Sequence, residues 1–129
     1  MKRLALIGAG LTVFLMFLQA GSPAPVESHA FPVRSDPRVG WKVTGSPAKV
    51  TIWFDSEIEP AFSTIAVYNA AKQRVDKNNA RVSPSDATVL EVDLPPLPPG
   101  SYRVYWSVVA KDTHRTEGSF PFAVQEKSP

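Results

Sequence analysis

The chain has 129 residues, a length that suits one domain with a modest core. Its 14 basic and 12 acidic residues give a formal net charge of +2, which offers no electrostatic reason to expect nucleic acid or an anionic membrane as a partner. Cysteine is absent, and this excludes disulfides, thiolate metal sites and thiol catalysis.

The first 28 residues have the pattern of a signal peptide. Lys2 and Arg3 supply its positive start, and the uncharged apolar run over residues 4–18 is shorter than the roughly 20 residues that a membrane-spanning helix needs. Small residues favour cleavage after Ser28, whereas a rival cleavage point after Ala20 fits less well. We therefore predict that this segment, residues 1–28, is removed during export.

Removal of the leader would leave a single domain over residues 29–129 that begins with His29. Both methionines, Met1 and Met16, lie in the leader, so the mature chain contains no sulfur ligand of any kind. Any metal ion must then be held by nitrogen and oxygen atoms, and sulfur-rich sites of the kind that favour Cu(I) are excluded.

The mature chain alternates short apolar segments with proline, glycine and polar turns. A period-two pattern predicts strands with one face towards a core over residues 49–54, 64–68, 88–94, 101–109 and 119–124. Pro121 predicts that the last of these is an edge strand or a bulged strand. With no amphipathic helix in the pattern, the fold class is all-β: an immunoglobulin-like antiparallel β-sandwich or Greek-key barrel.

Asp112 and His114 follow the longest predicted strand and are two residues apart. In an extended segment such side chains point to the same side, so a carboxylate and an imidazole could reach one ion. The alternative is a solvated turn in which Asp112 only accepts backbone hydrogen bonds.

His29 is the other of the two histidines, and cleavage after Ser28 would give it a free α-amine beside its imidazole. These groups have reference pKa values of about 7.7–8.0 and 6.5, so a metal competes readily for both near neutral pH. Together with Asp112 and His114 they form a nitrogen and oxygen ligand set that suits the tetragonal geometry of Cu(II). The alternative is a frayed terminus without a role.

A series of motifs runs nearly end to end along the mature chain: His29-Ala30, Ser35-Asp36-Pro37 with Gly40, and the segments 50–54, 94–106, 108–114 and 118–120. In their order and spacing these motifs resemble the CopC family of periplasmic copper-resistance proteins. This resemblance implies a periplasmic protein that holds one Cu(II) per chain through His29, Asp112 and His114. Some members carry a methionine-rich Cu(I) site, which this mature chain lacks.

Many members of that family also have an acidic residue soon after the first core strand. Here Asp55 and Glu57 both stand at that place, and either could lie near the metal or only be solvated. The resemblance also implies a partner, either an inner-membrane copper transporter of the CopD type or another periplasmic copper protein.

The expected role is copper resistance, buffering or transfer, and no enzymatic activity is expected. One rival interpretation is a copper-dependent oxidative enzyme that uses an N-terminal histidine chelate. The other is a metal-free immunoglobulin-like interaction module. A hydrolase is not favoured, because no nucleophile–base pair stands out in the sequence.

Overall fold

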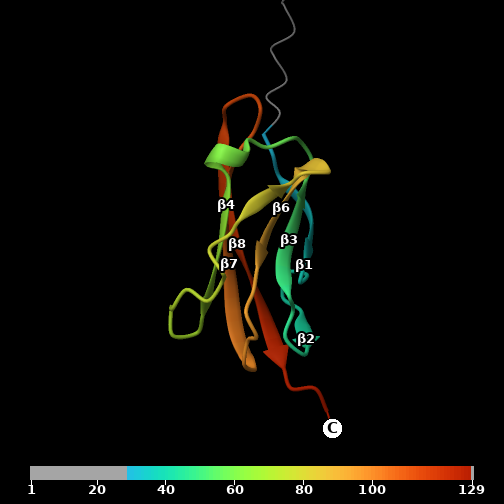
Figure 1. Cartoon of the computed structure of the whole chain (residues 1–129), viewed down its shortest axis with the longest axis vertical. Helices are drawn as coiled ribbons and strands as arrows, with labels where there is room; N and C mark the ends of the chain where they lie inside the picture. The colour runs from blue at the N-terminus through green and yellow to red at the C-terminus, as the bar shows by residue number, and fades with distance from the viewer. Residues whose placement is uncertain (1–28, 129) are drawn as a thin grey trace, which may run out of the picture.

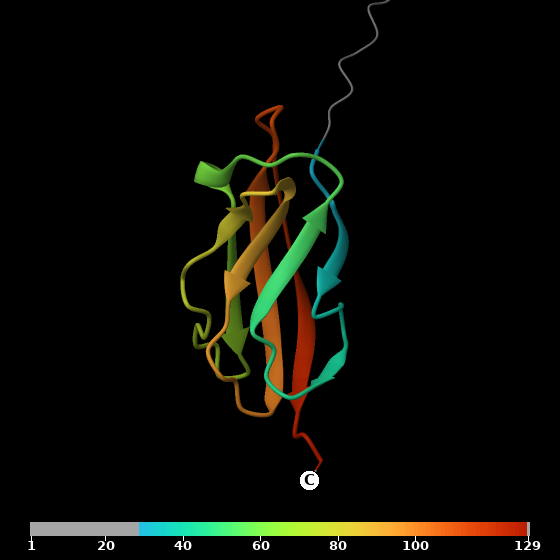
Figure 2. The same cartoon turned by 45° about the vertical axis from the view of Figure 1, so that its right-hand side comes forward.

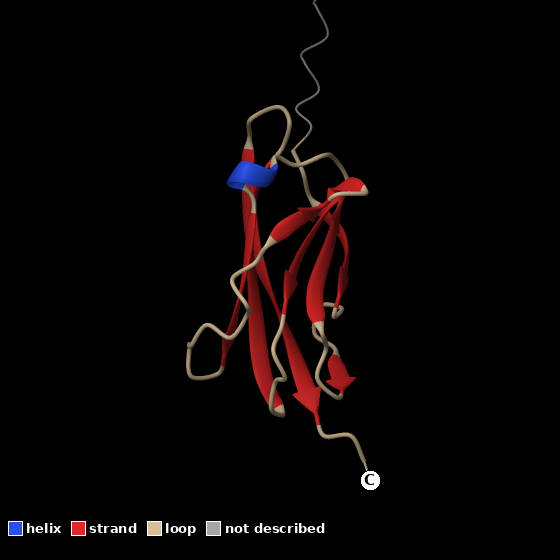
Figure 3. Ribbon diagram, in the orientation of Figure 1, coloured by secondary structure: helices blue, strands red, loops and turns tan. Residues whose placement is uncertain are grey.

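The computed structural model describes residues 29–128, so the predicted signal peptide and its cleavage lie outside the described residues. Two four-stranded sheets stack face to face as a sandwich (Figure 1), and the connections between strands are turns and loops (Figure 3). Within residues 29–128 the only helix is η1, a short 3-10 helix at Pro60–Phe62. The predicted all-β sandwich is thus confirmed.

The first sheet has the order β1-β3-β6-β5 and the second has the order β2-β8-β7-β4. All neighbours are antiparallel except β2 and β8, which run parallel. Figure 2 shows β1, β3 and β6 of the first sheet in front of β7 and β8. The bounds are β1 Pro32–Asp36, β2 Lys42–Thr44, β3 Lys49–Phe54, β4 Thr64–Asn69, β5 Arg81–Ser83, β6 Asp86–Asp93, β7 Gly100–Val109 and β8 Arg115–Gln125.

The core lies between the sheets and follows the predicted alternation. The side chains that β7 turns inward are all buried, namely Tyr102, Val104, Trp106 and Val108. Beside them in the same sheet lie the inward residues of β8, Phe120 and Phe122, and across the core lie those of β3 and β6: Val50, Ile52, Phe54, Leu90 and Val92. The indole of Trp106 lies so close to Gly118 that a Cβ there would stand 2.7 Å from Cζ2. Glycine at position 118 is therefore a packing requirement.

The prediction for Pro121 was wrong. Strand β8 lies between β2 and β7, and its pairing with β7 is regular from Arg115 to Val124. The carbonyl of Pro121 accepts a hydrogen bond from the backbone N–H of Gly40 at 2.7 Å. The proline nitrogen points to that same side, where β2 has not yet begun, so the missing N–H removes no bond from the pairing with β7.

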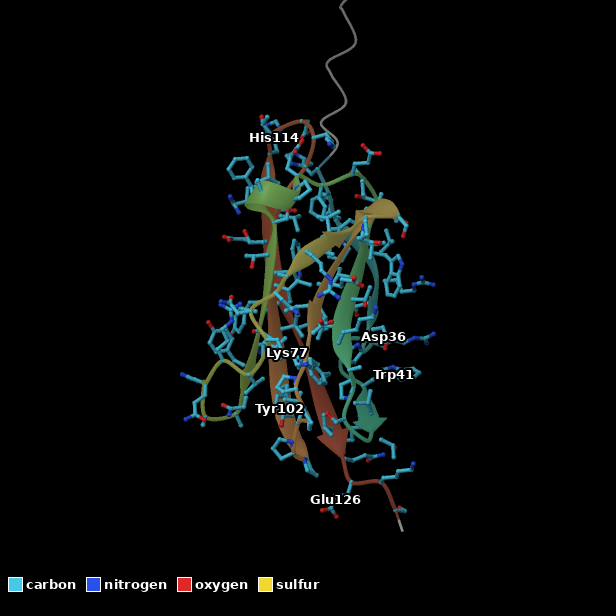
Figure 4. The ribbon with its side chains drawn as sticks, viewed as in Figure 1. Asp36, Trp41, Lys77, Tyr102, His114 and Glu126 are labelled. Carbon is cyan, nitrogen blue, oxygen red and sulfur yellow. The ribbon has the colours of Figure 1, made fainter. Side chains whose placement is uncertain are left out.

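The turn between β7 and β8, the loop after β3 and the start of the described chain meet at one end of the sandwich. Figure 1 shows the short green helix η1 beside this turn, with the blue start of the described chain at the same end. His114 lies at this end and Glu126 at the other (Figure 4). None of the helices among the described residues has the length and apolar character needed to cross a membrane.

Candidate metal centre

A tight turn carries Asp112 and His114. The backbone N–H of Ala110 donates to the carbonyl of His114 at 3.0 Å, and the N–H of Thr113 donates to the carbonyl of Ala110 at 2.9 Å. Thr113 has a φ of +73°, the left-handed residue that closes a three-residue hairpin loop. The expectation of an extended segment here was wrong, because this turn, and not strand alternation, sets the directions of both side chains.

The two oxygens of Asp112 have different roles. Oδ1 accepts a hydrogen bond from the backbone N–H of His114 at 3.1 Å, which fixes the carboxylate in the turn. Oδ2 is buried and accepts no hydrogen bond among the described residues. Nδ1 of His114 lies 3.2 Å from it, a contact that becomes an ion pair when the imidazole is protonated. A buried carboxylate oxygen left without a donor is costly unless a cation completes its environment.

The charge state of Asp112 suits a cation. The hydrogen bond from the backbone N–H of His114 is the main cause that lowers the pKa of this carboxyl; desolvation opposes it less strongly, and the imidazoles of His114 and His29 add smaller lowering effects. The carboxylate is therefore ionised throughout the neutral range.

His29 completes a cluster with the turn. Its ring lies 4.8 Å from that of His114, centroid to centroid, with the two planes tilted by 57°. One ligand atom from each of His29, Asp112 and His114 can be chosen so that all three lie within 4.8 Å of one another. Two imidazole nitrogens and a carboxylate oxygen at this spacing fit a divalent transition metal, and Cu(II) and Zn²⁺ both accept such ligands.

The backbone that carries His29 is tied down on both sides. Ala30 is fully buried, and its carbonyl accepts a hydrogen bond from the hydroxyl of Thr116 in β8. The hydroxyl of Ser56 donates to the carbonyl of His29 at 3.4 Å. These contacts come from opposite sheets, so the backbone at His29 is anchored to both sheets of the sandwich.

Asp55 supplies a further anchor, and sequence reasoning did not identify it. Its Oδ1 accepts the backbone N–H of Phe31 at 2.8 Å, and its own N–H donates to the carbonyl of Phe31 at 2.9 Å. Glu57 contributes its backbone carbonyl to Lys111 at 3.3 Å, beside the metal turn. Of the two carboxylates, Asp55 therefore holds the segment that bears His29, and neither belongs to the three-residue ligand cluster.

Comparisons with known proteins identify the family of the chain. The family model of the CopC domain matches residues 32–125. A copper transport protein of Bacillus subtilis, CutJ, is 33% identical over 115 residues, which are 88% of this chain but only 20% of that protein. Copper resistance protein C of Xanthomonas campestris pv. juglandis is 28% identical over 120 residues, 88% of this chain and 94% of that one.

Two solved structures share the fold at similar identity. The crystal structure of CopC from Methylosinus trichosporium superposes with a TM-score of 0.73 at 31% identity, over 78% of this chain and 98% of that one. PcoC, a methionine-rich copper resistance protein from Escherichia coli, gives a TM-score of 0.65 at 28% identity, over 76% and 100%.

The fold and the cluster together define a small β-sandwich with a candidate metal centre at one end. The chain belongs to the CopC family, as the match over residues 32–125 shows. It is accordingly a copper-related protein, and copper is the metal to test at this centre.

Proposed function

We propose that the protein is exported to the periplasm by its leader, residues 1–28, and there binds one Cu(II) ion per chain. The ligands are the imidazoles of His29 and His114, the carboxylate of Asp112 and the α-amine that cleavage after Ser28 would free. The observation that carries this proposal is the buried Oδ2 of Asp112, which has no hydrogen-bond donor among the described residues and lies 3.2 Å from Nδ1 of His114.

The ligand chemistry selects the metal and its oxidation state. Nitrogen and oxygen donors favour Cu(II) over Zn²⁺ in the divalent series, whereas Cu(I) prefers thiolate and thioether ligands. The chain has no cysteine, and its two methionines stand at positions 1 and 16 within the leader. We therefore expect one Cu(II) site and weak binding of Cu(I).

The role that follows is to carry or buffer copper outside the cytoplasm. The side chain of His114 is 47% exposed, so an incoming ligand can reach the metal without unfolding the domain. A CopD-type inner-membrane transporter or another periplasmic copper protein is the proposed recipient. An oxidative enzyme is the rival, and oxidised sugars formed from a polysaccharide with reductant and peroxide would favour it.

The test is Cu(II) competition against a chromophoric chelator, with an electron paramagnetic resonance spectrum of each form. The protein is secreted from the full-length gene, and its first residue is established by intact mass. The His114→Ala variant should lose at least about tenfold in Cu(II) affinity, because an imidazole ligand is gone. Wild-type affinity in that variant would contradict the ligand assignment.

A second variant tests the amine. One residue inserted directly before His29 keeps every side chain but turns the α-amine nitrogen of His29 into a peptide nitrogen. Cu(II) affinity should fall and the spectrum should change. One residue added after Pro129, at the far end, is the matched control and should change neither. An unchanged spectrum in the first variant would mean that side chains alone hold the metal.

A further inference from the structure

The outward faces of the two sheets differ in a way that the metal centre does not explain. On the first sheet four charges of β3, β5 and β6 are paired within the chain: Lys49 with Glu91 at 3.1 Å, and Arg81 with Glu91 at 3.2 Å and Asp93 at 3.0 Å. On the second sheet the outward residues of β4, β7 and β8 are mostly small, hydroxyl-bearing or aromatic, namely Thr64, Ala66, Tyr68, Tyr105, Ser107, Ser119 and Pro121.

This second face is hollowed on either side of one exposed tyrosine. Tyr105 is 47% exposed and lines two shallow hollows of about 630 and 370 Å³, and Ala66, its cross-strand neighbour, lines both. The ring of Tyr68 meets that of Tyr105 edge to face at 5.5 Å and forms part of the wall of the larger hollow. An aromatic ring standing between two recesses is a surface that another sheet can pack against.

Three charged residues of β7 and β8 on this face, Arg103, Arg115 and Glu117, have no ion pair among the described residues. Two of them, Arg103 and Glu117, lie symmetrically about Tyr105 along the strand direction. Arg103 precedes Tyr105 by two residues on β7, and Glu117 lies opposite Ser107, two residues beyond Tyr105. Both are exposed; Arg103 donates only to the hydroxyl of Ser119, at 3.1 Å.

We propose that this face binds a second copy of the chain, sheet against sheet, about a two-fold axis that passes near Tyr105 and runs across the strands. Such an axis reverses the strand direction, so Arg103 of each copy comes to the level of Glu117 of the other, one strand spacing of about 4.8 Å to the side. Packed sheets lie about 10 Å apart, a distance that arginine and glutamate side chains can bridge.

The charge pattern also selects this axis over its alternative. A two-fold axis along β7 would bring Arg103 over Arg103 in the other copy, which places like charges together at the interface. The antiparallel arrangement makes two opposite-charge pairs instead, and the two Tyr105 rings meet at its centre. Arg115 lies on the same face, two residues before Glu117 on β8 and nearer the metal end, and it is held within its own chain by hydrogen bonds to the hydroxyl of Ser107 at 2.6 Å and to the carbonyl of Phe62 at 3.4 Å.

The area of the face predicts a weak dimer. Three strands about 4.8 Å apart and about ten residues long present roughly 500 Å² per copy, or about 1,000 Å² in total, near the lower limit for a specific complex. We therefore expect a reversible monomer–dimer equilibrium. Because the strands of the two copies are antiparallel, the two clusters around His114 lie at opposite ends of the dimer and both stay open.

The proposal is tested by sedimentation analysis of the protein secreted from the full-length gene. A chelator is present so that no metal bridges two copies. The mass should rise towards twice that of the monomer between about 1 µM and 1 mM, the range of a weak complex. Arg103→Glu and Glu117→Arg should each lower the association constant at least about tenfold, because each places like charges opposite one another. The double variant restores opposite charges and should recover the dimer.

Arg34→Glu, the same change on the outward face of the other sheet, is the matched control and should leave association unchanged. Copper affinity should be equal in all these variants, which separates this proposal from the metal-binding one. A protein that stays monomeric at about 1 mM would overturn the proposal and leave this face for a different partner. A dimer that survives both single substitutions would also overturn it, since another surface must then be used.

Discussion

Asp55 should control copper affinity without touching the metal. In the Asp55→Ala variant the N–H of Phe31 loses its acceptor, while the bond from the N–H of residue 55 to the carbonyl of Phe31 remains. A hydrogen bond to a charged acceptor contributes about 1.5–3 kcal/mol, and the exposure of Asp55 favours the low end. Since the hydroxyl of Thr116 still holds Ala30, only part of this loss reaches His29. We expect Cu(II) affinity to fall about three- to tenfold.

The matched control is Glu57→Ala, which removes the same charge from the same loop but leaves both hydrogen bonds between residue 55 and Phe31 intact. Cu(II) competition should show less than a twofold change in this variant, and Asp55→Asn, which keeps an acceptor oxygen, should behave similarly. Equal losses in Asp55→Ala and Glu57→Ala would refute the reasoning, because the effect would then be general electrostatics and not the position of His29.

Three further predictions concern stability and are measured by urea unfolding. Gly118→Ala should lower the free energy of unfolding by about 1–3 kcal/mol, because the new Cβ meets the indole of Trp106 at 2.7 Å; a neutral effect would show that the indole moves freely. Burial raises the pKa of Asp76, but hydrogen bonds from Arg74 and the N–H groups of Val67 and Asn78 outweigh it, so the pKa of the folded state lies below the usual value. The stabilisation is thus present above about pH 4 and lost as the pH falls through the folded-state pKa. Asp76→Ala should cost about 1–3 kcal/mol at pH 7 and less at pH 2, and a loss independent of pH would contradict this. Thr113→Gly should raise stability by about 0.5–1 kcal/mol, because glycine adopts the φ of +73° without strain; destabilisation would show that the threonine side chain is needed.

The strands that face the core were predictable, and those that do not were missed. Strand β3 has the predicted bounds, and β7 differs by one residue, because alternation records which side chains are buried. Strands β1, β2 and β5 show at most one fully buried residue each and hence no period-two pattern. Pairing with β3, β8 and β6 holds them in place, and pairing partners distant in sequence leave no local signal.

The residues of the candidate site also fall into a group that the sequence predicted and a group that it did not. Ligand chemistry is local, so Asp112 and His114 were visible as a motif and His29 as a residue exposed by cleavage. The groups that position them act on backbone atoms far away along the chain. Asp55 bonds to Phe31, 24 residues earlier, and Thr116 bonds to Ala30, 86 residues earlier. Neither residue type predicts such a bond from the sequence. Only the packing of the two sheets brings these partners together.

The site's location also ties metal binding to the sandwich as a whole. His29 enters the first sheet, where Asp55 follows β3, while Asp112 and His114 belong to the turn between two strands of the second sheet. An ion shared by these side chains would therefore link the two sheets, at an end where the chain itself joins them through the contact of Thr116 with Ala30 and the backbone bonds of Glu57 and Glu59 to Lys111 and Val109. Since a ligand that binds only the folded form stabilises it, copper would stabilise the packing of sheet on sheet. The same placement keeps the ligands at the rim, where His114 is half exposed, so a metal that stabilises the fold still remains within reach of an acceptor.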